Sequence, residues 1–333
     1  MADVARHAGV SVMTVSRVLN GFPNVAEDTR LRVEDAMATL GYRANSAARI
    51  LAGGRSRTLG VIAVETDQFG PSQLLSGIEA AARVANHALT FVMLRRFDID
   101  EMQSTLGHLR GLQVEGAVVV APLREVVDAA TSLDDDLPLV IVGGDPSVDA
   151  STVTIDQRAG ARMATEHLLG LGHTTVHHIS GPRTWIDASE RVQGWRDALR
   201  SHGAQRGSVL TGDWTARGGY AAGARLVKDP SVTAIFAAND QTALGLVRAL
   251  CEHGRSVPED VSVVGFDDTP ESGYFLPPLT TIRQNFAEVG ERCVQLLLSQ
   301  LDDSRGNLHI TIAPELVVRD SSMAPSASIT EAG

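Results

Sequence analysis

The first twenty residues constrain the fold of this chain most, because they place two short apolar helical patterns around a turn. Asp3–Ala8 predicts a first helix, and Gly9 supplies the turn. Ser11 suits the N-cap of a second helix, since its hydroxyl can accept hydrogen bonds from free backbone amides. A buried helical stripe follows at i, i+3, i+4 spacing, formed by Val15, Val18 and Leu19. This pattern indicates a helix-turn-helix, which reads the DNA major groove.

The outward face of the second helix is the surface expected to enter the groove. Its side chains are small, polar or basic: Val12, Met13, Thr14, Ser16, Arg17 and Asn20. A third helix is expected over about 27–40, because acidic residues open it and Gly41 ends it. We therefore predict a DNA-binding domain over residues 1–44. A three-helix unit that only packs on a larger domain is the alternative.

Charge is divided unevenly along the 333 residues, whose formal net charge is −11. Residues 1–57 contain eight arginines and five acidic residues, a net charge of +3. The remainder contains 21 basic and 35 acidic residues, a net charge of −14. A basic end on an acidic body is expected when only that end meets DNA phosphates. Since +3 is small, affinity should depend on dimerisation as well as on charge.

Composition and motifs argue against several other classes of protein. No segment resembles a signal peptide, and no apolar run approaches the roughly 18 residues of a membrane span. We therefore expect a cytoplasmic protein with no membrane partner. A secreted sugar-binding protein would have a signal peptide and would lack a DNA-reading head, so this class does not fit the sequence. No phosphate loop, His-Glu-x-x-His or Gly-x-Ser-x-Gly motif is present, so we expect neither an enzyme nor a bound cofactor.

Cysteines and histidines give no metal signal. Cys251 and Cys293 are far apart in apolar helical patterns, which predicts buried free thiols rather than a disulfide or a metal site. His177 and His178 fall in a predicted strand, so alternate rings should point to the two faces of a sheet. We expect these histidines to be structural.

Residues 45–57 are predicted to join the DNA-binding domain to the rest of the chain. Residues 45–52 can form one or two helical turns, which Gly53 and Gly54 end. Such a helix is marginal alone, because nucleation costs more than so few residues recover. We expect it to order only against DNA or a second copy, and a plain flexible tether is the alternative. Arg55-Ser56-Arg57 completes a basic linker.

From Thr58 onward, short apolar or β-branched runs alternate with helical patterns in two series. The first series has elements at Leu59–Val64, 72–87, Leu89–Leu94, 99–111, Ala117–Ala121, 123–133 and Leu139–Val142. The second begins after Ile155 and has elements at 157–171, Thr175–Ile179, 188–202, Ser208–Leu210, 216–228, Ala234–Ala237, 240–254 and Val261–Phe266. A last helix near 286–301 and a strand near 308–313 are expected to return to the first series. Such alternation predicts parallel sheets built from right-handed crossovers.

Two such series predict an α/β fold with two lobes and a ligand cleft at the carboxyl ends of the strands. The core is expected over 58–320, with a first lobe of about 58–155 and 286–319 and a second of about 156–282. Residues 321–333 are small and polar, so we expect a disordered tail. The tail has no leucine heptad, and we expect no four-chain assembly through it.

Several ordered motifs resemble those of lactose/galactose-repressor family transcription factors. The densest are Gly9-Val10-Ser11 with Thr14-Val15-Ser16-Arg17-Val18, Ala237-Ala238-Asn239-Asp240-Gln241, Val263-Val264-Gly265-Phe266-Asp267-Asp268-Thr269 and Pro277-Pro278-Leu279-Thr280-Thr281-Ile282. The likeness runs from Asp3 to about Arg319. It implies a helix-turn-helix head on a two-lobed, periplasmic-binding-protein-like core. It further implies a homodimeric repressor that releases pseudo-palindromic operator DNA when a small effector enters the cleft.

The resemblance places groove-reading positions on Val12, Met13 and Arg17. Arg17 can donate two hydrogen bonds to guanine, and the apolar pair favours contact with a thymine methyl group. Further positions near phosphates or bases fall on Asn20, Asn24 and Tyr42. A hinge leucine that wedges into the minor groove and kinks the duplex matches Leu51. The residues beside it are Asn45 and Ala48, and a plain dimer contact is the alternative for the leucine.

The family's polar effector-binding residues fall on Arg191, Asn239 and Asp267. Their chemistry suits a sugar, because a guanidinium can donate to two hydroxyls, a carboxylate accepts from hydroxyls and an amide does both. Trp214 corresponds to an aromatic ring that stacks on a pyranose face. The remaining pocket positions fall on Pro71, Gln284 and Phe286.

Three positions depart from the pattern of a lactose-responsive family member. That pattern has aspartate at Gly143, asparagine at Val120 and serine at Asp187. The sugar therefore need not be a β-galactoside. A regulator that answers to a purine or another small metabolite, with co-repressor logic, is the alternative, and Trp214 with Asn239 favours a sugar.

Overall fold

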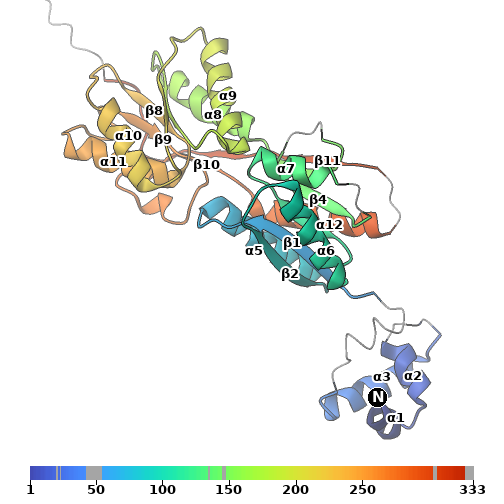
Figure 1. The fold of residues 1–333 in the computed structure, drawn as a ribbon. Coiled ribbons are helices and arrows are strands. Elements are labelled where there is room, and N and C mark those ends of the chain that lie inside the picture. The colour runs from blue at the N-terminus through green and yellow to red at the C-terminus, as the bar shows by residue number, and fades with distance from the viewer. Residues whose placement is uncertain are drawn as a thin grey trace, which may run out of the picture.

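The computed structural model describes residues 1–19, 22, 24–42, 55–133, 136–144, 148–302 and 306–326. Helices α1 (Ala2–Ala8), α2 (Val12–Leu19) and α3 (Glu27–Thr39) form an N-terminal head. A two-lobed core follows it in the chain (Figure 1). The head has its own small apolar core, formed by Val4, Ala8, Val15, Val18, Val33 and Ala36. The predicted three-helix unit is therefore confirmed.

Local chemistry explains why α1 and α2 meet at a turn. Gly9 has a φ of 64°, a left-handed conformation that costs glycine little because it lacks a Cβ atom. The Ser11 hydroxyl accepts a hydrogen bond from the Thr14 amide at 3.1 Å, which caps α2 as predicted. Glu27 and Asp28 lie in the first turn of α3, where the positive end of the helix dipole stabilises negative charge.

The first lobe is a parallel sheet covered by helices on both faces. Its six described strands lie in the order β11-β5-β4-β3-β1-β2, and every pair is parallel. The strands are β1 (Thr58–Val64), β2 (Ala88–Leu94), β3 (Ala117–Val120), β4 (Leu139–Val142), β5 (Ser151–Ile155) and β11 (His309–Ile312). The helices are α5 (Phe69–Val84), α6 (Ile99–Gly111), α7 (Arg124–Thr131) and α12 (Phe286–Leu301).

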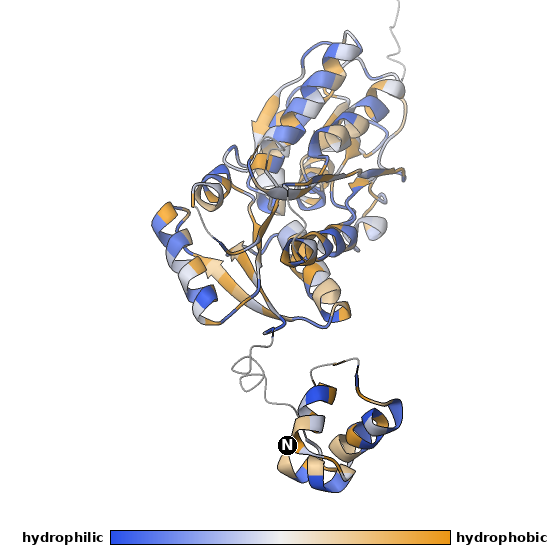
Figure 2. Cartoon of the chain, turned by 90° about the vertical axis from the view of Figure 1, so that its right-hand side faces the viewer, coloured by the Kyte–Doolittle hydropathy of each residue, from blue (hydrophilic) through white to orange (hydrophobic). Residues whose placement is uncertain are grey.

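Alternating side chains of β1 divide the first lobe's core into two layers. Val61 and Ala63 pack with α5 and α12, whereas Ile62 packs with α6 and α7 on the other face. Figure 2 shows the apolar strands inside this lobe and polar helical surfaces outside. At Gly77 and Gly290, α5 and α12 approach so closely that a Cβ atom on either would clash with backbone. This contact fixes the start of α12, which borders the cleft described below.

The second lobe repeats this plan with a smaller parallel sheet. Its four described strands lie in the order β7-β6-β8-β9 and are β6 (His177–Ser180), β7 (Val209–Thr211), β8 (Ala234–Ala237) and β9 (Ser262–Val264). Helices α8 (Gln157–Gly170) and α9 (Ile186–Ser201) cover one face. Helices α10 (Ala216–Leu226) and α11 (Asp240–Glu252) cover the other. A short 3₁₀ helix, η1 (Ser272–Tyr274), follows β9.

Three short strands were not expected from the sequence, and one of them moves a lobe boundary. β5 was missed because its Ser-Thr-Val-Thr-Ile composition is mostly polar. β12 (Glu315–Val317) pairs antiparallel with β10 (Thr281–Arg283), and Leu316 packs into the second lobe's core. The prediction that 286–319 belongs to the first lobe is therefore wrong after β11. Pairing with β10 satisfies the backbone of β12 and partly buries Leu316. These gains place β12 in the second lobe although β11, just before it in the chain, belongs to the first.

The start of the tail is also ordered, contrary to the predicted disorder of 321–333. Ser321 is fully buried. Its hydroxyl donates to the Val263 carbonyl at 2.6 Å and accepts from the Thr280 amide at 2.8 Å. A small polar residue thus anchors the chain by pairing backbone groups rather than by apolar burial. Residues after 326 lie outside the described residues.

Two smaller predictions concern cysteines and membranes. Cys293 is a buried free thiol as predicted, whereas Cys251 is exposed on the outer face of α11. The prediction for Cys251 failed because the helical pattern around it is apolar on one face only, formed by Leu246, Ala249 and Leu250. Among the described residues, every helix is too short or too polar to cross a membrane.

Replacing Ser321 with alanine should destabilise the second lobe. The change leaves the Thr280 amide and the Val263 carbonyl buried with one partner fewer, which typically costs about 1–3 kcal/mol. Urea denaturation followed by circular dichroism would measure the loss. Ser326→Ala is the matched control, because that hydroxyl makes a single exposed hydrogen bond, 3.0 Å from the Glu259 carbonyl. Equal unfolding free energies for the two variants would show that the Ser321 hydroxyl does not stabilise the lobe.

Candidate functional site

A cavity of about 450 Å³ lies between the two lobes. It is bordered by the segments that follow β3, β4 and β5 in the first lobe and β6, β8 and β9 in the second. The carboxyl ends of parallel strands meet at such a cleft, which is where α/β proteins bind ligands. All seven predicted effector-binding residues line it: Pro71, Arg191, Trp214, Asn239, Asp267, Gln284 and Phe286. Their role in binding stays a prediction.

Arg191 and Asp267 form the polar wall of the cavity with two glutamines. Arg191 Nε donates to Gln157 Oε1 at 2.9 Å, and Gln157 Nε2 donates to Gln284 Oε1 at 2.8 Å. Gln284 Nε2 donates to Asp267 Oδ1 at 2.6 Å. The circuit closes at Asp267 Oδ1, which lies 3.8 Å from Arg191 Nη2. Each side chain therefore fixes the next, so the wall is preorganised.

The Arg191 side chain is held in place by more than its carboxylate partner. It is only 4 % exposed, and it donates a further hydrogen bond to the Ala238 carbonyl. Its guanidinium lies 3.8 Å from the centre of the Phe266 ring and 5.3 Å from that of Trp214. Flat stacking on an aromatic face suits the planar guanidinium and favours one orientation of its N–H groups.

Asn239 and Trp214 are tied to each other at the start of α11. Asn239 Oδ1 caps the helix by accepting from the Thr242 amide at 2.9 Å, and Nδ2 donates to the Trp214 carbonyl at 3.1 Å. Trp214 has a φ of 68°, which is unusual for a large side chain. Its ring lies against Gly181, where a Cβ atom would overlap it. The loop thus holds Trp214 in one position, where it lines the cavity.

The pKa of Asp267 is raised to about 7, chiefly by burial; Arg191 opposes the shift, and nearby Asp240 adds to it. Asp240 is itself buried, which raises its pKa to about 6 despite hydrogen bonds from Ser272, Thr281 and the Thr269 amide. Asp267 also has a φ of 113°. A strained backbone and a desolvated carboxylate at one position are typical of functional sites.

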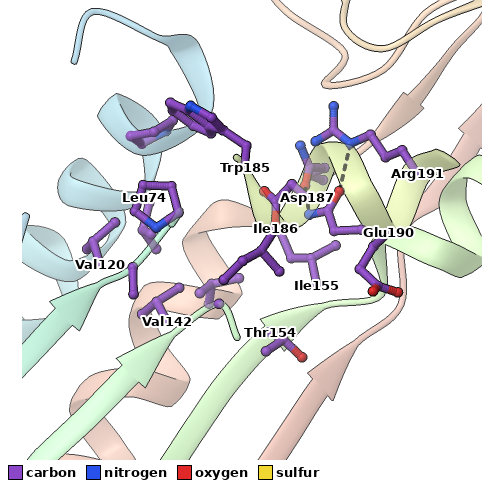
Figure 3. Close-up of a pocket in the computed structure, with 18 of the residues that line it drawn as sticks. Leu74, Val120, Val142, Thr154, Ile155, Trp185, Ile186, Asp187, Glu190 and Arg191 are labelled. Carbon is purple, nitrogen blue, oxygen red and sulfur yellow. Dashed lines mark hydrogen bonds between the residues drawn. The ribbon is translucent and has the colours of Figure 1, made fainter. Parts of the chain in front are cut away.

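The opposite wall of the cavity is mostly apolar. Figure 3 shows Leu74, Val120 and Val142 across the cavity from Asp187, Glu190 and Arg191. The three positions that depart from the lactose-responsive pattern, Val120, Gly143 and Asp187, all line the cavity. Burial raises the pKa of the Asp187 carboxyl, and Arg191 lowers it in part.

Sequence reasoning missed one residue that is central to the site. Gln157 links Arg191 to Gln284, and it is the first residue of α8. Its place directly after β5, at the crossing between lobes, was the available signal, because ligand sites gather at such strand ends. Missing β5 concealed that signal.

The predicted DNA-reading residues divide by exposure. Val12 is 46 % exposed and Met13 is 65 % exposed. Arg17 and Asn24 are exposed, while Thr14 and Ser16 are partly buried. Tyr42 packs against the head core. The remaining positions lie outside the described residues: Asn20, Asn45, Ala48 and Leu51. The structure therefore presents an outward α2 face, and its contacts with DNA stay predictions.

The fold and the site together define a regulator with a DNA-reading head and a ligand-binding core. Residues 1–45 match the family described as bacterial regulatory proteins, lacI family. Residues 165–322 match the periplasmic binding protein-like domain.

Similar proteins cover nearly the whole chain. It is 34 % identical over 331 residues to the lactose operon repressor of Escherichia coli (strain K12), covering 97 % of this chain and 91 % of that protein. A crystal structure of the lac repressor dimer bound to operator and the anti-inducer ONPF matches with a TM-score of 0.86 and 32 % identity, covering 97 % and 98 %.

Two further relatives are a transcriptional regulator CelR–cellobiose complex and a PurR repressor. The former has a TM-score of 0.72 and 30 % identity, covering 96 % of this chain and 98 % of that one. The HTH-type transcriptional repressor PurR of Mannheimia succiniciproducens is 32 % identical over 327 residues, covering 96 % and 97 %. This chain belongs to the lacI family of bacterial transcriptional regulators.

Replacing Asp267 with asparagine should change how stability depends on pH. The folded-state pKa of Asp267, about 7, lies above its ordinary value of 3.8. The folded protein therefore binds this proton more tightly, and the associated stability is full below the unfolded pKa and lost as pH rises through the folded one. The unfolding free energy of the original protein, minus that of Asp267→Asn, should fall from about pH 4 to about pH 7.

Urea titrations across that range would measure the difference. Asp35→Asn, at an exposed site in the head, is the control and should give a flat difference. A flat difference for Asp267→Asn as well would show that the carboxyl is already ionised throughout the range.

Proposed function

We propose that this chain is a homodimeric transcriptional repressor that leaves its operator when a small carbohydrate binds between the lobes. The observation that carries the proposal is the preorganised polar wall of Arg191 and Asp267, set beside the Trp214 ring in a cavity of about 450 Å³. A cavity of this size accommodates a small ligand. The head with its exposed α2 face supplies the DNA-binding part, and the relatives above support the combination.

The chemistry of the wall favours a polyhydroxylated ligand. Arg191 supplies donors, the oxygens of the Asp267 carboxyl supply acceptors, and the indole of Trp214 offers an apolar face to ring C–H groups. A purine would also fit an aromatic face, so ligand identity must be measured. Thermal-shift assays with a panel of mono- and disaccharides and of nucleobases would separate the classes. Ligand at about 100 times its Kd stabilises the folded state by about 2.7 kcal/mol.

Helix α12 connects the cleft to the linker that leads to the head. Arg55 Nη1 lies 3.2 Å from Asp302 Oδ1, and Arg55 Nη2 donates to the Leu301 carbonyl at 2.9 Å. These contacts attach the end of the linker to α12, whose first residue, Phe286, lines the cavity. We propose that lobe closure on a sugar moves the two linkers of a dimer apart. The required coupling is about 1–3 kcal/mol.

Replacing Arg17 with alanine should relax base preference at one position of each operator half-site. A bidentate contact from arginine to guanine contributes about 1–3 kcal/mol of discrimination. Selection from a randomised operator library, followed by gel-shift titration, would measure it. Arg6→Ala is the matched control, because it removes the same charge from an exposed site on α1. Unchanged base preference in Arg17→Ala would contradict the assignment.

Replacing Arg191 with alanine should weaken sugar binding while DNA binding persists. The variant loses a charge-assisted hydrogen bond to the ligand and leaves Asp267 without its cation, a cost of about 1.5–3 kcal/mol. Calorimetry with the sugar found in the panel would measure the loss, and operator gel shifts would confirm an intact head. Arg225→Ala, on the exposed side of α10, is the control. Undiminished sugar affinity in Arg191→Ala would exclude this cleft as the effector site.

A further inference from the structure

Two adjoining cavities on another face of α9 gather arginine side chains. One, of about 490 Å³, is lined by Arg183, Arg196 and Arg206 together with Ser189 and Gln193. The other, of about 560 Å³, shares Arg196 and Arg206 with it. The effector cleft uses a different side of the same helix, which carries Asp187 and Arg191. We call the two adjoining cavities the arginine cavity.

The arginine cavity concentrates positive charge on an acidic body. Residues after 57 have a net charge of −14, yet neither cavity is lined by an aspartate or glutamate among the described residues. Ion pairs occupy many arginines elsewhere in the core, and Arg200, which also lines the larger cavity, pairs with Asp197 at 3.1 Å. In the described part of the chain, Arg183, Arg196 and Arg206 have no ion pair within 4.0 Å.

Arg196, which lines both cavities, has an unsatisfied donor. Arg196 Nε is buried and lacks a hydrogen-bond partner within the described residues. His178 lies close enough for Arg191 and Arg196 to lower its pKa, which burial brings to about 4, so this ring stays neutral. A buried donor on a cation is costly unless an acceptor or a counter-charge approaches it. An anion in the cavity would supply the counter-charge for Arg196 that the described residues around it do not supply.

We propose that the arginine cavity binds a small phosphate-bearing anion, which is either inorganic phosphate or the phosphoryl group of a phosphorylated metabolite. Guanidinium groups match the oxygens of phosphate in bidentate geometry, and several converging on one cavity define a site rather than a diffuse basic surface. The side-chain amide of Gln193 adds donors at the same place. The site is separate from the effector cleft and does not depend on the identity of the sugar.

Calorimetric titration of the full chain with sodium phosphate, with a hexose 6-phosphate and with the unphosphorylated hexose tests the proposal, in sodium chloride of matched ionic strength. We expect saturable binding of a phosphate-bearing ligand. The Arg196→Gln/Arg206→Gln double variant should weaken that binding at least about tenfold, as loss of charge-assisted hydrogen bonds predicts. Arg225→Gln is the matched control for the single variant Arg206→Gln, because it too removes one charge from an exposed site but lies outside both cavities.

Arg206→Gln alone keeps the test valid if the double variant does not fold, since Arg206 is exposed. Tighter binding of the hexose phosphate identifies a metabolite as the ligand, and tighter binding of phosphate identifies the free ion. The binding heat of the phosphate-bearing ligand should persist when the unphosphorylated hexose is present and in the Asp267→Asn variant. Loss of that heat in either case would place the anion in the effector cleft and overturn the proposal. Absence of binding, or equal affinity in the Arg206→Gln variant, would overturn it too.

Discussion

The buried guanidinium of Arg191 is the group around which the second lobe's half of the cleft is organised. It reaches Gln157 at the start of α8, the Ala238 carbonyl after β8 and the Phe266 ring after β9. Burying a cation is unfavourable unless charge, hydrogen bonds and packing all compensate for lost water. Three separate elements supply those partners. Removing one partner would therefore leave the buried charge less well compensated.

The same network lies where the chain passes between lobes. Gln157 follows β5, and Gln284 follows β10, so both glutamines belong to crossing segments. Their mutual hydrogen bond of 2.8 Å joins the two crossings directly. A ligand can shift a conformational equilibrium only by contacting groups whose positions differ between the states. Groups at the crossings meet that condition better than groups deep in either lobe.

Helix α9 connects two electrostatic environments. One side carries Arg191, whose charge is matched by Asp267, and another carries Arg196, whose charge has no carboxylate within ion-pair distance in the described structure. His178, whose pKa both arginines lower, stacks on Phe236 with 4.5 Å between ring centres and remains neutral. The helix therefore presents a satisfied cation to the effector cleft and an unsatisfied one to the arginine cavity.

Local patterns in the amino-acid order were sufficient for the head and for most strands and helices of the core, whereas the predicted residues of the cleft came from the resemblance to the family. Helix periodicity, the Ser11 cap and the apolar strands act over a few residues, so they can be recognised without knowing distant partners. The seven residues carried over from the family pattern meet in one cavity. They do so because the carboxyl ends of parallel strands lie at one edge of each sheet.

Features that depend on distant partners could not be predicted in this way. Polar β5 is a strand because β4 and β11 flank it, and β12 joins the second lobe because β10 offers an open edge. Ser321 is ordered because its hydroxyl forms hydrogen bonds with two backbone groups, although its sequence neighbours are typical of a disordered tail. The arginine cavity likewise brings together residues from α9 and two loops. In each case the stabilising partner is remote in sequence, and only folding places it within hydrogen-bonding or Coulombic range.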